Sequence, residues 1–189
     1  MARRLFHGRA ILVLLLLAGV VVATLDMLFP PPAPPPWSAQ VFARDGQLLS
    51  AFLSSDDKWR LRTRLDAVTP ELIEAMVEKE DRWFLYHPGV NPVAVLRALW
   101  SNLVQGRRVS GASTITMQVA RDFYLSPQKT PLRKFTEALM AYKIEHELSK
   151  NQILERYLNQ VYLGQRAYGV AAAAQVYFGK PLDQLSLAQ

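Results

Sequence analysis

The N-terminal end of the chain divides it into parts that cannot share one core. A continuous apolar run, Ala10–Leu25, is followed closely by the proline-rich segment 30–36, and Asp26 is the one charged residue between them. With its flanks, the run approaches the roughly 20 apolar residues that a helix needs to cross a bilayer. Successive prolines cannot continue a helix and form a stiff polyproline II spacer instead. The sequence therefore predicts a transmembrane helix within residues 1–29, a spacer at 30–36 and a separate folded part after it.

Three arginines, Arg3, Arg4 and Arg9, precede the apolar run. Because positive residues are retained on the cytoplasmic side of a membrane, they predict a cytoplasmic N-terminus and a folded part on the outer side. A cleaved signal peptide is the alternative, but no small-x-small cleavage site precedes Asp26. An uncleaved, single-pass anchor is therefore favoured.

The composition limits the size of the fold and the class of its partners. Half of the 189 residues are hydrophobic, which is enough for one modest domain with attachments. The chain has no cysteine, which excludes disulfide bonds and thiolate metal sites. The net charge of +6 favours anionic partners. Because the basic residues are scattered and no glycine- and aromatic-rich RNA-binding signature is present, we expect no nucleic acid and favour an anionic lipid or a pyrophosphate.

Residues 37–65 are predicted to form a β-hairpin linker, because Asp45–Gly46 separates two apolar runs and Asp-Gly is a preferred hairpin turn. Residues 66–189 are predicted to form a mainly α-helical domain. Prolines at first helical positions, polar caps and closing glycines mark its helices. The predicted helices begin at Pro70 and then cover about 92–104, 114–124, 131–148, 150–164 and 169–178.

In the first of these helices an acid stands on the apolar face. Ile73, Met76, Val77 and Phe84 share one stripe, and Glu80 lies about 20° from Ile73 around the helix axis. Such a break in a local rule tends to mark a functional or strained site. Partial desolvation disfavours the charged form of a carboxyl group, which suits it to accept a proton. The alternative is a helix that ends before Glu80, so that the acid turns to solvent; the pattern alone leaves both open.

A second acid, Glu137, begins another apolar stripe that continues to Leu148. Arg133 and Lys134 stand four and three residues before it, so they border the same helix face. Taken alone, this pattern equally describes a surface ion pair worth well under ~1 kcal/mol. Two acids in the same unusual setting favour a functional role for both.

The segment Gly111–Gln118 is the third candidate. Its small and hydroxyl residues, among them Ser113 and Thr114, open a predicted helix. Backbone N–H groups and hydroxyl donors at a helix N-terminus can cradle an anion. Ordinary N-capping explains Ser113 and Thr114 equally well.

Two other patterns do not predict sites. The segment Ser126–Lys129 fits S-x-x-K, a signature of acyl-enzyme serines, but it lies in a proline-containing loop and neither S-x-N nor K-T-G follows. The histidines His7, His87 and His146 lack metal-ligand spacing. We expect His87 to hold the loop after Glu80 through a hydrogen bond.

Five motifs, in order over residues 70–189, resemble the peptidoglycan glycosyltransferases of family 51, which are the transglycosylase domains of class A penicillin-binding proteins and the monofunctional transglycosylases. The matching positions are Glu80, Asp81, Phe84, His87 and Gly89 of E-D-x-x-F-x-x-H-x-G; Gly111 to Gln118 of G-[AS]-S-T-I-T-x-Q; Arg133, Lys134 and Glu137 of R-K-x-x-E; Ile153, Leu154, Glu155, Tyr157, Leu158, Asn159, Tyr162 and Gly164 of I-L-E-x-Y-L-N-x-x-Y-x-G; and Ala173, Ala174, Tyr177, Phe178, Gly179 and Lys180 of A-A-x-x-Y-F-G-K.

The chain departs from the family pattern in two ways. Met117 stands where the family usually has glutamine, which with the proline-rich spacer is similar to the 1C type, whereas residues 121–189 are more similar to the 1A type. The subtype therefore stays open. The chain ends at Gln189, before the last helices usual for this domain, and includes no transpeptidase domain, so we expect a domain that is incomplete at its C-terminus.

The resemblance implies a lysozyme-like helical fold and a reaction. Members of the family join lipid II units into β-1,4 glycan strands outside the cytoplasmic membrane and release undecaprenyl pyrophosphate. The anomeric configuration inverts, which fits a single displacement without a covalent intermediate. The implied partners are lipid II, the growing glycan strand, the bacterial inner membrane and other cell-wall synthesis proteins.

The resemblance also implies roles for the motif residues. Glu80 would be the general base, and cations would stabilise the departing pyrophosphate. Glu137 would orient those cations, assist departure or bind a divalent cation, Mg²⁺ or Mn²⁺. The implied catalytic residues are Glu80 and Glu137, and the implied substrate-binding residues are Asp81, Phe84, His87, Ser113, Thr114, Gln118, Arg121, Arg133 and Lys134.

Two other classes of function remain open. A peptidoglycan-cleaving enzyme, such as a lysozyme-like muramidase or a lytic transglycosylase, also needs an acid in a helical domain. The cluster Arg133, Lys134 and Glu137, together with the anchor, favours a pyrophosphate donor instead. The second alternative is a non-catalytic, membrane-anchored fragment. Activity on lipid II distinguishes all three.

Overall fold

The computed structural model describes residues 35–46, 48–107, 111–124, 131–186 and 188–189, with a few scattered helical positions between 13 and 27. The predicted anchor and spacer fall almost entirely outside these residues. Across the described residues, no helix is both long and apolar enough to cross a membrane. The chain divides into two units, 1–34 and 35–189, and the second contains all the predicted site residues.

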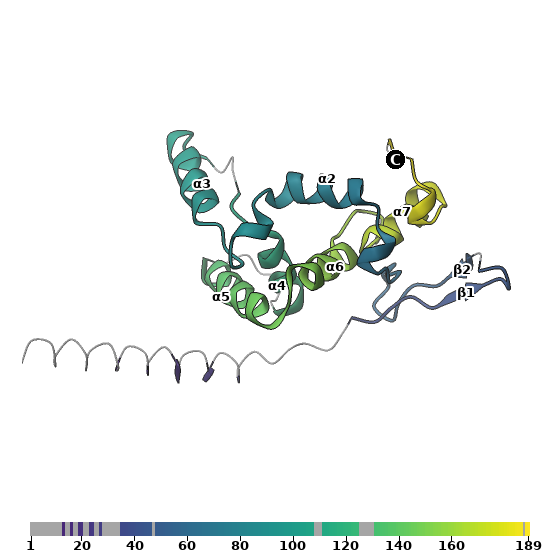
Figure 1. The fold of residues 1–189 in the computed structure, drawn as a ribbon, viewed down its shortest axis with the longest axis horizontal. Helices are drawn as coiled ribbons and strands as arrows, with labels where there is room; N and C mark the ends of the chain where they lie inside the picture. The colour runs from purple at the N-terminus through teal and green to yellow at the C-terminus, as the bar shows by residue number, and fades with distance from the viewer. Residues whose placement is uncertain are drawn as a thin grey trace, which may run out of the picture. The chain divides into compact units, whose positions relative to one another are not determined.

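The predicted hairpin is confirmed (Figure 1). Strands β1 (Gln40–Phe42) and β2 (Leu48–Ala51) pair antiparallel, with an irregular register between Val41 and Phe42. Gly46 supplies the positive φ of +88° in the turn. Behind the hairpin, the buried residues Leu61, Ala167 and Ala172 form a small core against which Leu48 and Ala51 pack. The hairpin is therefore part of the same compact unit as the helices.

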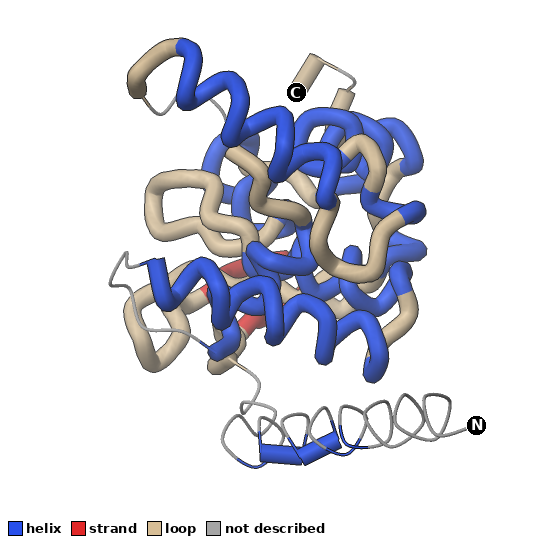
Figure 2. Tube along the Cα trace, turned by 90° about the vertical axis from the view of Figure 1, so that its left-hand side faces the viewer, coloured by secondary structure: helices blue, strands red, loops and turns tan. Residues whose placement is uncertain are grey.

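The rest of the unit is mainly helical, as predicted, and Figure 2 shows the two strands as a small part of a largely helical body. The helices are α2 (Pro70–Asp81), α3 (Pro92–Val104), α4 (Ile115–Tyr124), α5 (Pro131–Glu147), α6 (Lys150–Gln160) and α7 (Val170–Phe178), and single 3-10 turns cover Leu65–Ala67, Phe84–Tyr86 and Leu182–Gln184. The capping box predicted before α6 is present, since Ser149 and Gln152 bond each other's backbone N–H groups.

One predicted helix end was wrong. The helix expected to run to about Gly164 ends at Gln160. Beyond it, Tyr162 bridges to Tyr168, and the N–H of Ala167 donates to the carbonyl of Gly164. The backbone of the intervening residues turns through positive φ. Pairing of the chain with itself therefore replaces the last predicted helical turn.

Helix α4 is the centre of the packing, in contact with α2, α5 and α6. Its residues Ile115, Val119 and Ala120 are almost completely buried. Facing them, Met140 and Ala141 of α5 are fully buried, as are Ile153 and Leu158 of α6. The N-terminus and face of α4 are thus fixed by three other helices, which makes it a rigid support for polar side chains.

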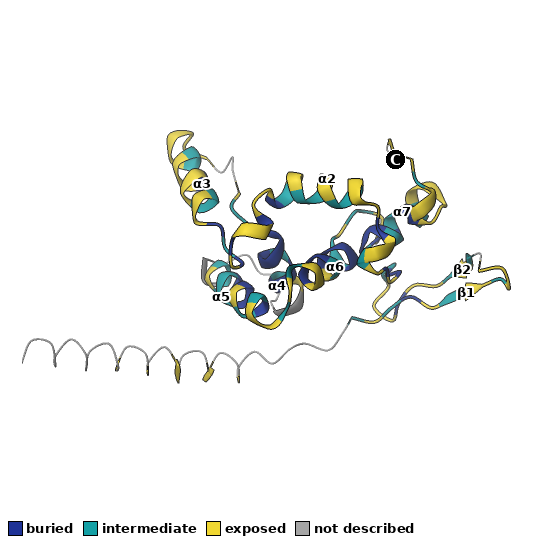
Figure 3. Cartoon of the chain, in the orientation of Figure 1, coloured by how far each residue is buried: buried dark blue, intermediate teal, exposed yellow. Residues whose placement is uncertain are grey.

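Helix α3 follows a different pattern, and Figure 3 shows it exposed over most of its length. The side chain of Asn91 caps it by accepting from the N–H of Ala94. Ala98 is its one buried residue. Val95 is half-buried. The other large apolar side chains of the helix are exposed, and they are Val93, Leu96, Leu99, Trp100, Leu103 and Val104.

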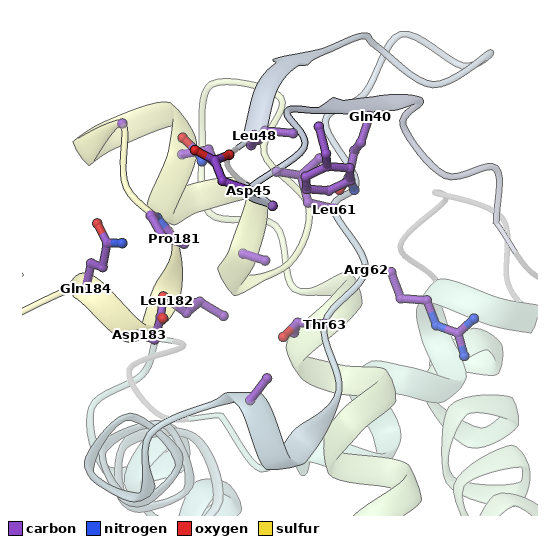
Figure 4. Close-up of a pocket in the computed structure, with 16 residues that line it drawn as sticks. Gln40, Asp45, Leu48, Leu61, Arg62, Thr63, Pro181, Leu182, Asp183 and Gln184 are labelled. Carbon is purple, nitrogen blue, oxygen red and sulfur yellow. The ribbon is translucent and has the colours of Figure 1, made fainter.

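A groove of about 990 Å³ lies between the hairpin, residues 61–63 and the segment that follows α7 (Figure 4). Leu48, Leu61, Pro181 and Leu182 contribute to its lining. The described residues that line it include none of those predicted for the catalytic or substrate-binding site. The groove is therefore separate from the constellation of acids and cations.

Candidate active site

Glu80 lies inside α2, which continues to Asp81. The alternative in which the helix ends earlier is therefore wrong. Glu80 is half-buried on the same face as Ile73, Met76 and Val77, which are also half-buried. The side-chain Nε2 of Gln118, on α4, donates to Glu80 Oε2 at 2.9 Å. The acid is thus held between two helices by a neutral amide.

Asp81, the next residue, is buried and accepts hydrogen bonds from the start of α4 and from the loop after α2. Its carboxylate accepts the backbone N–H of Ile115, the first residue of α4, at 3.0 Å. Both of its oxygens lie 3.0 Å from His87 Nε2. Because a carboxylate can only accept, that nitrogen is the donor. His87 therefore holds the loop after Glu80 by a hydrogen bond, as predicted. The bond from Ile115 to Asp81 fixes α2 against α4.

A second, partly buried network supports the same loop. The ammonium group of Lys150 lies 4.5 Å from the centre of the Phe84 ring and donates to the carbonyl of His87 and to Glu145 Oε1, each at 2.7 Å. The hydroxyl of Thr116 donates to the same Glu145 oxygen at 2.6 Å. The sequence analysis missed Lys150 and Glu145. Neither position stands out in the sequence. Lys150 simply follows the cap Ser149, and Glu145 follows the buried Ile144.

Thr114 and Gly89 join the loop to the start of α4. The hydroxyl of Thr114 accepts the N–H of Met117 at 3.1 Å, as an N-cap does, and donates to the carbonyl of Gly89 at 2.5 Å. Gly89 has a φ of +88°, and a Cβ there would lie 2.8 Å from the backbone carbonyl of Ala141. The close approach of loop and α5 thus requires glycine.

The second predicted constellation is present around Glu137, which is fully buried at 0% exposure. Its Oε1 accepts from Arg133 Nε at 3.0 Å, and its Oε2 accepts from the Lys134 ammonium. Lys134 also donates to Ser113 Oγ at 2.7 Å. The Lys134 side chain is 41% exposed and that of Arg133 12%. Of the two cations, Lys134 is the one more accessible to a ligand.

Arg121 and Asp122 extend this polar region along α4, with 3.5 Å between Arg121 Nε and Asp122 Oδ1. Burial raises the pKa of Asp122, and the charge of Glu137 adds to the rise, while Arg121 and Arg133 oppose it. The sequence analysis missed Asp122, although its position four residues after Gln118 places it on the same helix face.

Several residues predicted to bind substrate are buried and bonded to the protein itself. Asp81, Phe84, His87 and Thr114 are between 1% and 8% exposed. Their contacts hold α2, α4 and the intervening loop together. A supporting role for these four is therefore favoured over direct contact with a substrate.

Glu137 does not suit the divalent cation that the resemblance implied. Both of its oxygens accept from cationic side chains. Within the described part of the chain, no cluster of three histidine, aspartate or glutamate side chains could hold a metal ion. Participation of Mg²⁺ or Mn²⁺ in the reaction stays a prediction.

Comparison with known proteins identifies similar chains. The profile of the family described as Transglycosylase matches residues 45–189. The penicillin-binding protein 1A of Escherichia coli (strain K12) is 49% identical over 148 residues, covering 78% of this chain and 17% of that protein. The proteins of the same name from Neisseria lactamica and Vibrio cholerae are 49% and 46% identical, covering 79% of this chain and 18% of theirs. The chain thus spans less than a fifth of the length of these relatives.

Proposed function

The chain belongs to the transglycosylase family, and from this premise we propose that residues 66–189 carry a peptidoglycan glycosyltransferase site that polymerises lipid II into β-1,4 glycan strands. One observation carries the proposal. Glu80 is held by a neutral amide, whereas Glu137 is enclosed by two cations. A carboxylate without a cationic partner can take a proton, and a cationic cluster can receive an anionic leaving group.

The proposed reaction is a single displacement. The 4-hydroxyl oxygen of the acceptor sugar forms a bond to the anomeric carbon of the donor as the bond from that carbon to the pyrophosphate oxygen breaks. The hydroxyl proton passes to Glu80, and the bonding electron pair leaves with undecaprenyl pyrophosphate. This accounts for inversion at the anomeric carbon without a covalent glycosyl-enzyme.

The cations would stabilise the negative charge that develops on the pyrophosphate. Of the two cations bound to Glu137, Lys134 has the more exposed side chain. Its second contact, with Ser113, directs it toward the N-terminus of α4. Arg121 lies on α4, in its last turn. Charge-assisted hydrogen bonds from ammonium and guanidinium groups suit phosphate oxygens. Cleavage of a finished glycan has no anionic leaving group, so this cluster does not favour a lysozyme-like hydrolase.

We further propose that the exposed apolar face of α3 contacts the outer surface of the inner membrane. A contiguous patch of this kind usually marks an interaction surface. Trp83, Leu85 and Tyr86, which lie just before α3 in the chain, are also large, apolar and exposed. Together with an anchor in residues 1–29 and a cytoplasmic N-terminus, this face would hold the site close to lipid-linked donors.

The test is polymerisation of lipid II by the full chain in detergent, with glycan products separated on a gel. Glu80→Gln should abolish polymer, because the amide cannot take the proton. Glu78→Gln is the matched control, since Glu78 lies on the same helix with its side chain 63% exposed, and polymer should persist. Polymer from Glu80→Gln would refute the role of the base. Cleavage of finished glycan without polymerisation would favour the hydrolase, and no activity on either substrate would favour a non-catalytic fragment.

A further inference from the structure

Lys150, the first residue of α6, connects this helix to the loop that follows α2. Its ammonium group donates to the carbonyl of His87 and to Glu145 Oε1, each at 2.7 Å, and lies 4.5 Å from the centre of the Phe84 ring. An ammonium group has three N–H donors, and a cation is attracted to an aromatic face. Two acceptors and one ring therefore engage Lys150 within the chain. It is less suited to bind a substrate than Lys134, whose side chain is more exposed.

Glu145, on α5, extends this connection to α4. Its Oε1 also accepts from the hydroxyl of Thr116 at 2.6 Å. The side chains of Glu145 and Lys150 are 9% and 24% exposed, so the pair is largely shielded from the solvent that weakens surface ion pairs. One carboxylate oxygen thus binds a donor from α4 and a donor from α6. We call Lys150, Glu145 and Thr116 the Lys150 cluster.

The cluster holds the helix that carries Gln118. Thr116 and Gln118 are two residues apart on α4, which places their side chains about 200° apart around the helix axis. Thr116 bonds to Glu145 on one side of the helix, and Gln118 bonds to Glu80 on the other. A shift of α4 away from the cluster would therefore change the distance between Gln118 and Glu80.

The cluster also holds the segment that carries Glu80. The residue after Glu80 is Asp81, whose carboxylate accepts from the ring of His87 at 3.0 Å. The backbone carbonyl of the same histidine accepts from Lys150. Only His87 thus stands between Lys150 and the end of α2. Both partners of the hydrogen bond between Glu80 and Gln118 are connected to one ammonium–carboxylate pair.

We propose that Lys150 is a positioning residue for catalysis, which sets the place of Glu80 relative to Gln118 by fixing α4 and the loop after α2 to the same point. The inference rests on the proposed function, because it assigns a support to the general base. Catalysis depends on reacting groups held in near-attack geometry, and a displacement of about 1 Å costs about a hundredfold in rate. Loss of Lys150 would therefore slow the bound complex more than it weakens substrate binding.

The first test measures lipid II polymerisation by the full chain with Lys150→Met. The substitution keeps an unbranched side chain and removes the ammonium group. We expect kcat to fall about a hundredfold and KM to change by less than about twofold, the pattern of an interaction that acts on the transition state. A kcat within about threefold of the unaltered chain overturns the proposal, and so does a fall of kcat/KM that lies in KM alone.

A second variant separates lost positioning from an unpaired charge. Lys150→Met leaves the Glu145 carboxylate without its cation, which can prevent folding. Lys150→Met combined with Glu145→Gln is measured beside it, because the amide is neutral. The double variant should fold and should have a kcat as low as that of the single variant. Recovery of kcat in the double variant overturns the proposal, and so does failure of both variants to fold, because Lys150 would then be structural.

Lys58→Met is the matched control. The Lys58 ammonium group also meets a carboxylate and a ring, since it lies 3.0 Å from Asp56 Oδ2 and 4.9 Å from the centre of the Tyr168 ring. This ion pair belongs to the segment between β2 and α2. Its loss should lower the melting temperature slightly and leave kcat unchanged. An equal fall of kcat in Lys58→Met and Lys150→Met would show a general effect of losing an ion pair and would overturn the proposal.

A further measurement is independent of activity. The side-chain amide of Gln118, which donates to Glu80 at 2.9 Å, is labelled with ¹⁵N, and its NMR signals are assigned by their loss in Gln118→Leu. In Lys150→Met these signals should move toward those of a solvent-exposed glutamine, and in Lys58→Met they should stay in place. Signals that stay in place in Lys150→Met overturn the inference even if polymerisation slows. Displaced signals in a chain that does not polymerise lipid II in any form support the inference and count against the proposed function alone.

Discussion

Helices α3 and α5 both reverse the usual distribution of polar and apolar side chains, in opposite senses. On α3, Leu96 and Leu103 are 68% and 78% exposed. On α5, the acid Glu137 is 0% exposed. The buried acid has its partners within the chain, Arg133 and Lys134. Among the described residues, the exposed apolar face of α3 has no such cover.

Under the proposed function, the two regions would respond to different parts of the substrate. A buried acid held by cations is a site prepared in advance for charge that develops during a reaction. An exposed apolar face is prepared for a medium such as a bilayer. A lipid-linked pyrophosphate has both features, a charged group and a hydrocarbon tail. Substitutions should therefore affect folding in one region and membrane contact in the other.

The largest effect should come from Glu137→Gln. Loss of the carboxylate leaves Arg133 and Lys134 without their buried counter-charge, and breaking a buried ion pair costs about 3–5 kcal/mol. We expect a lower melting temperature and no polymerisation. Glu147→Gln is the control on the same helix, because the Glu147 side chain is 46% exposed and its pair with Lys143 is long, at 3.7 Å. Equal losses of melting temperature in the two variants would show that the burial of Glu137 does not make it more important to the fold than Glu147.

Two glycines test how closely the backbone is packed, one in the loop against α5 and one just after α3. Gly89→Ala should destabilise the fold by about 3 kcal/mol, because φ is positive and the new Cβ would meet the backbone of Ala141. Gly106→Ala, just after α3, also has positive φ but open space around the Cβ, and it should cost about 1 kcal/mol. Chemical denaturation of the two variants provides the measurement. A smaller loss for Gly89→Ala than for Gly106→Ala would contradict the close packing assigned to the loop.

The apolar face of α3 should matter for membranes and little for folding. In Leu96→Gln with Leu103→Gln, we expect an unchanged melting temperature in detergent and polymerisation in liposomes about tenfold slower, because two exposed leucines would no longer enter the bilayer. Leu49→Gln is the control, since Leu49 is 63% exposed on the hairpin. A lower melting temperature in the double variant would show instead that α3 packs against protein.

Local sequence signals predicted the helices and both acids. The stripe around Glu80 and the spacing from Arg133 to Glu137 depend on the period of a helix, which neighbouring residues determine. The network of Lys150 with the His87 carbonyl joins residues 63 positions apart, and no local pattern encodes it. The early end of α6 depends on backbone pairing beyond it, which also lies outside local periodicity.

Asp122 should give the smallest effect, and one that depends on pH. Because burial raises the pKa of Asp122 in the folded chain, the folded form holds the proton more tightly than the unfolded form. Stability is then fully present below the ordinary aspartate pKa and falls as pH rises through the folded value. Asp122→Asn should therefore be more stable than the original chain at pH 7, by less than about 1 kcal/mol given its 43% exposed side chain.

The two chains should converge in stability at a pH below the usual aspartate range, where Asp122 is protonated in both folded and unfolded forms. Denaturation midpoints measured at several pH values test this, with Asp183→Asn, outside the site, as the control for a change of one charge. A pH-independent gain in Asp122→Asn would mean that burial of the charged Asp122 carboxylate is not the cause. A loss of stability at pH 7 would show that the pair with Arg121 outweighs both burial and the neighbouring charge of Glu137, so that the cationic cluster depends on Asp122 as it does on Glu137.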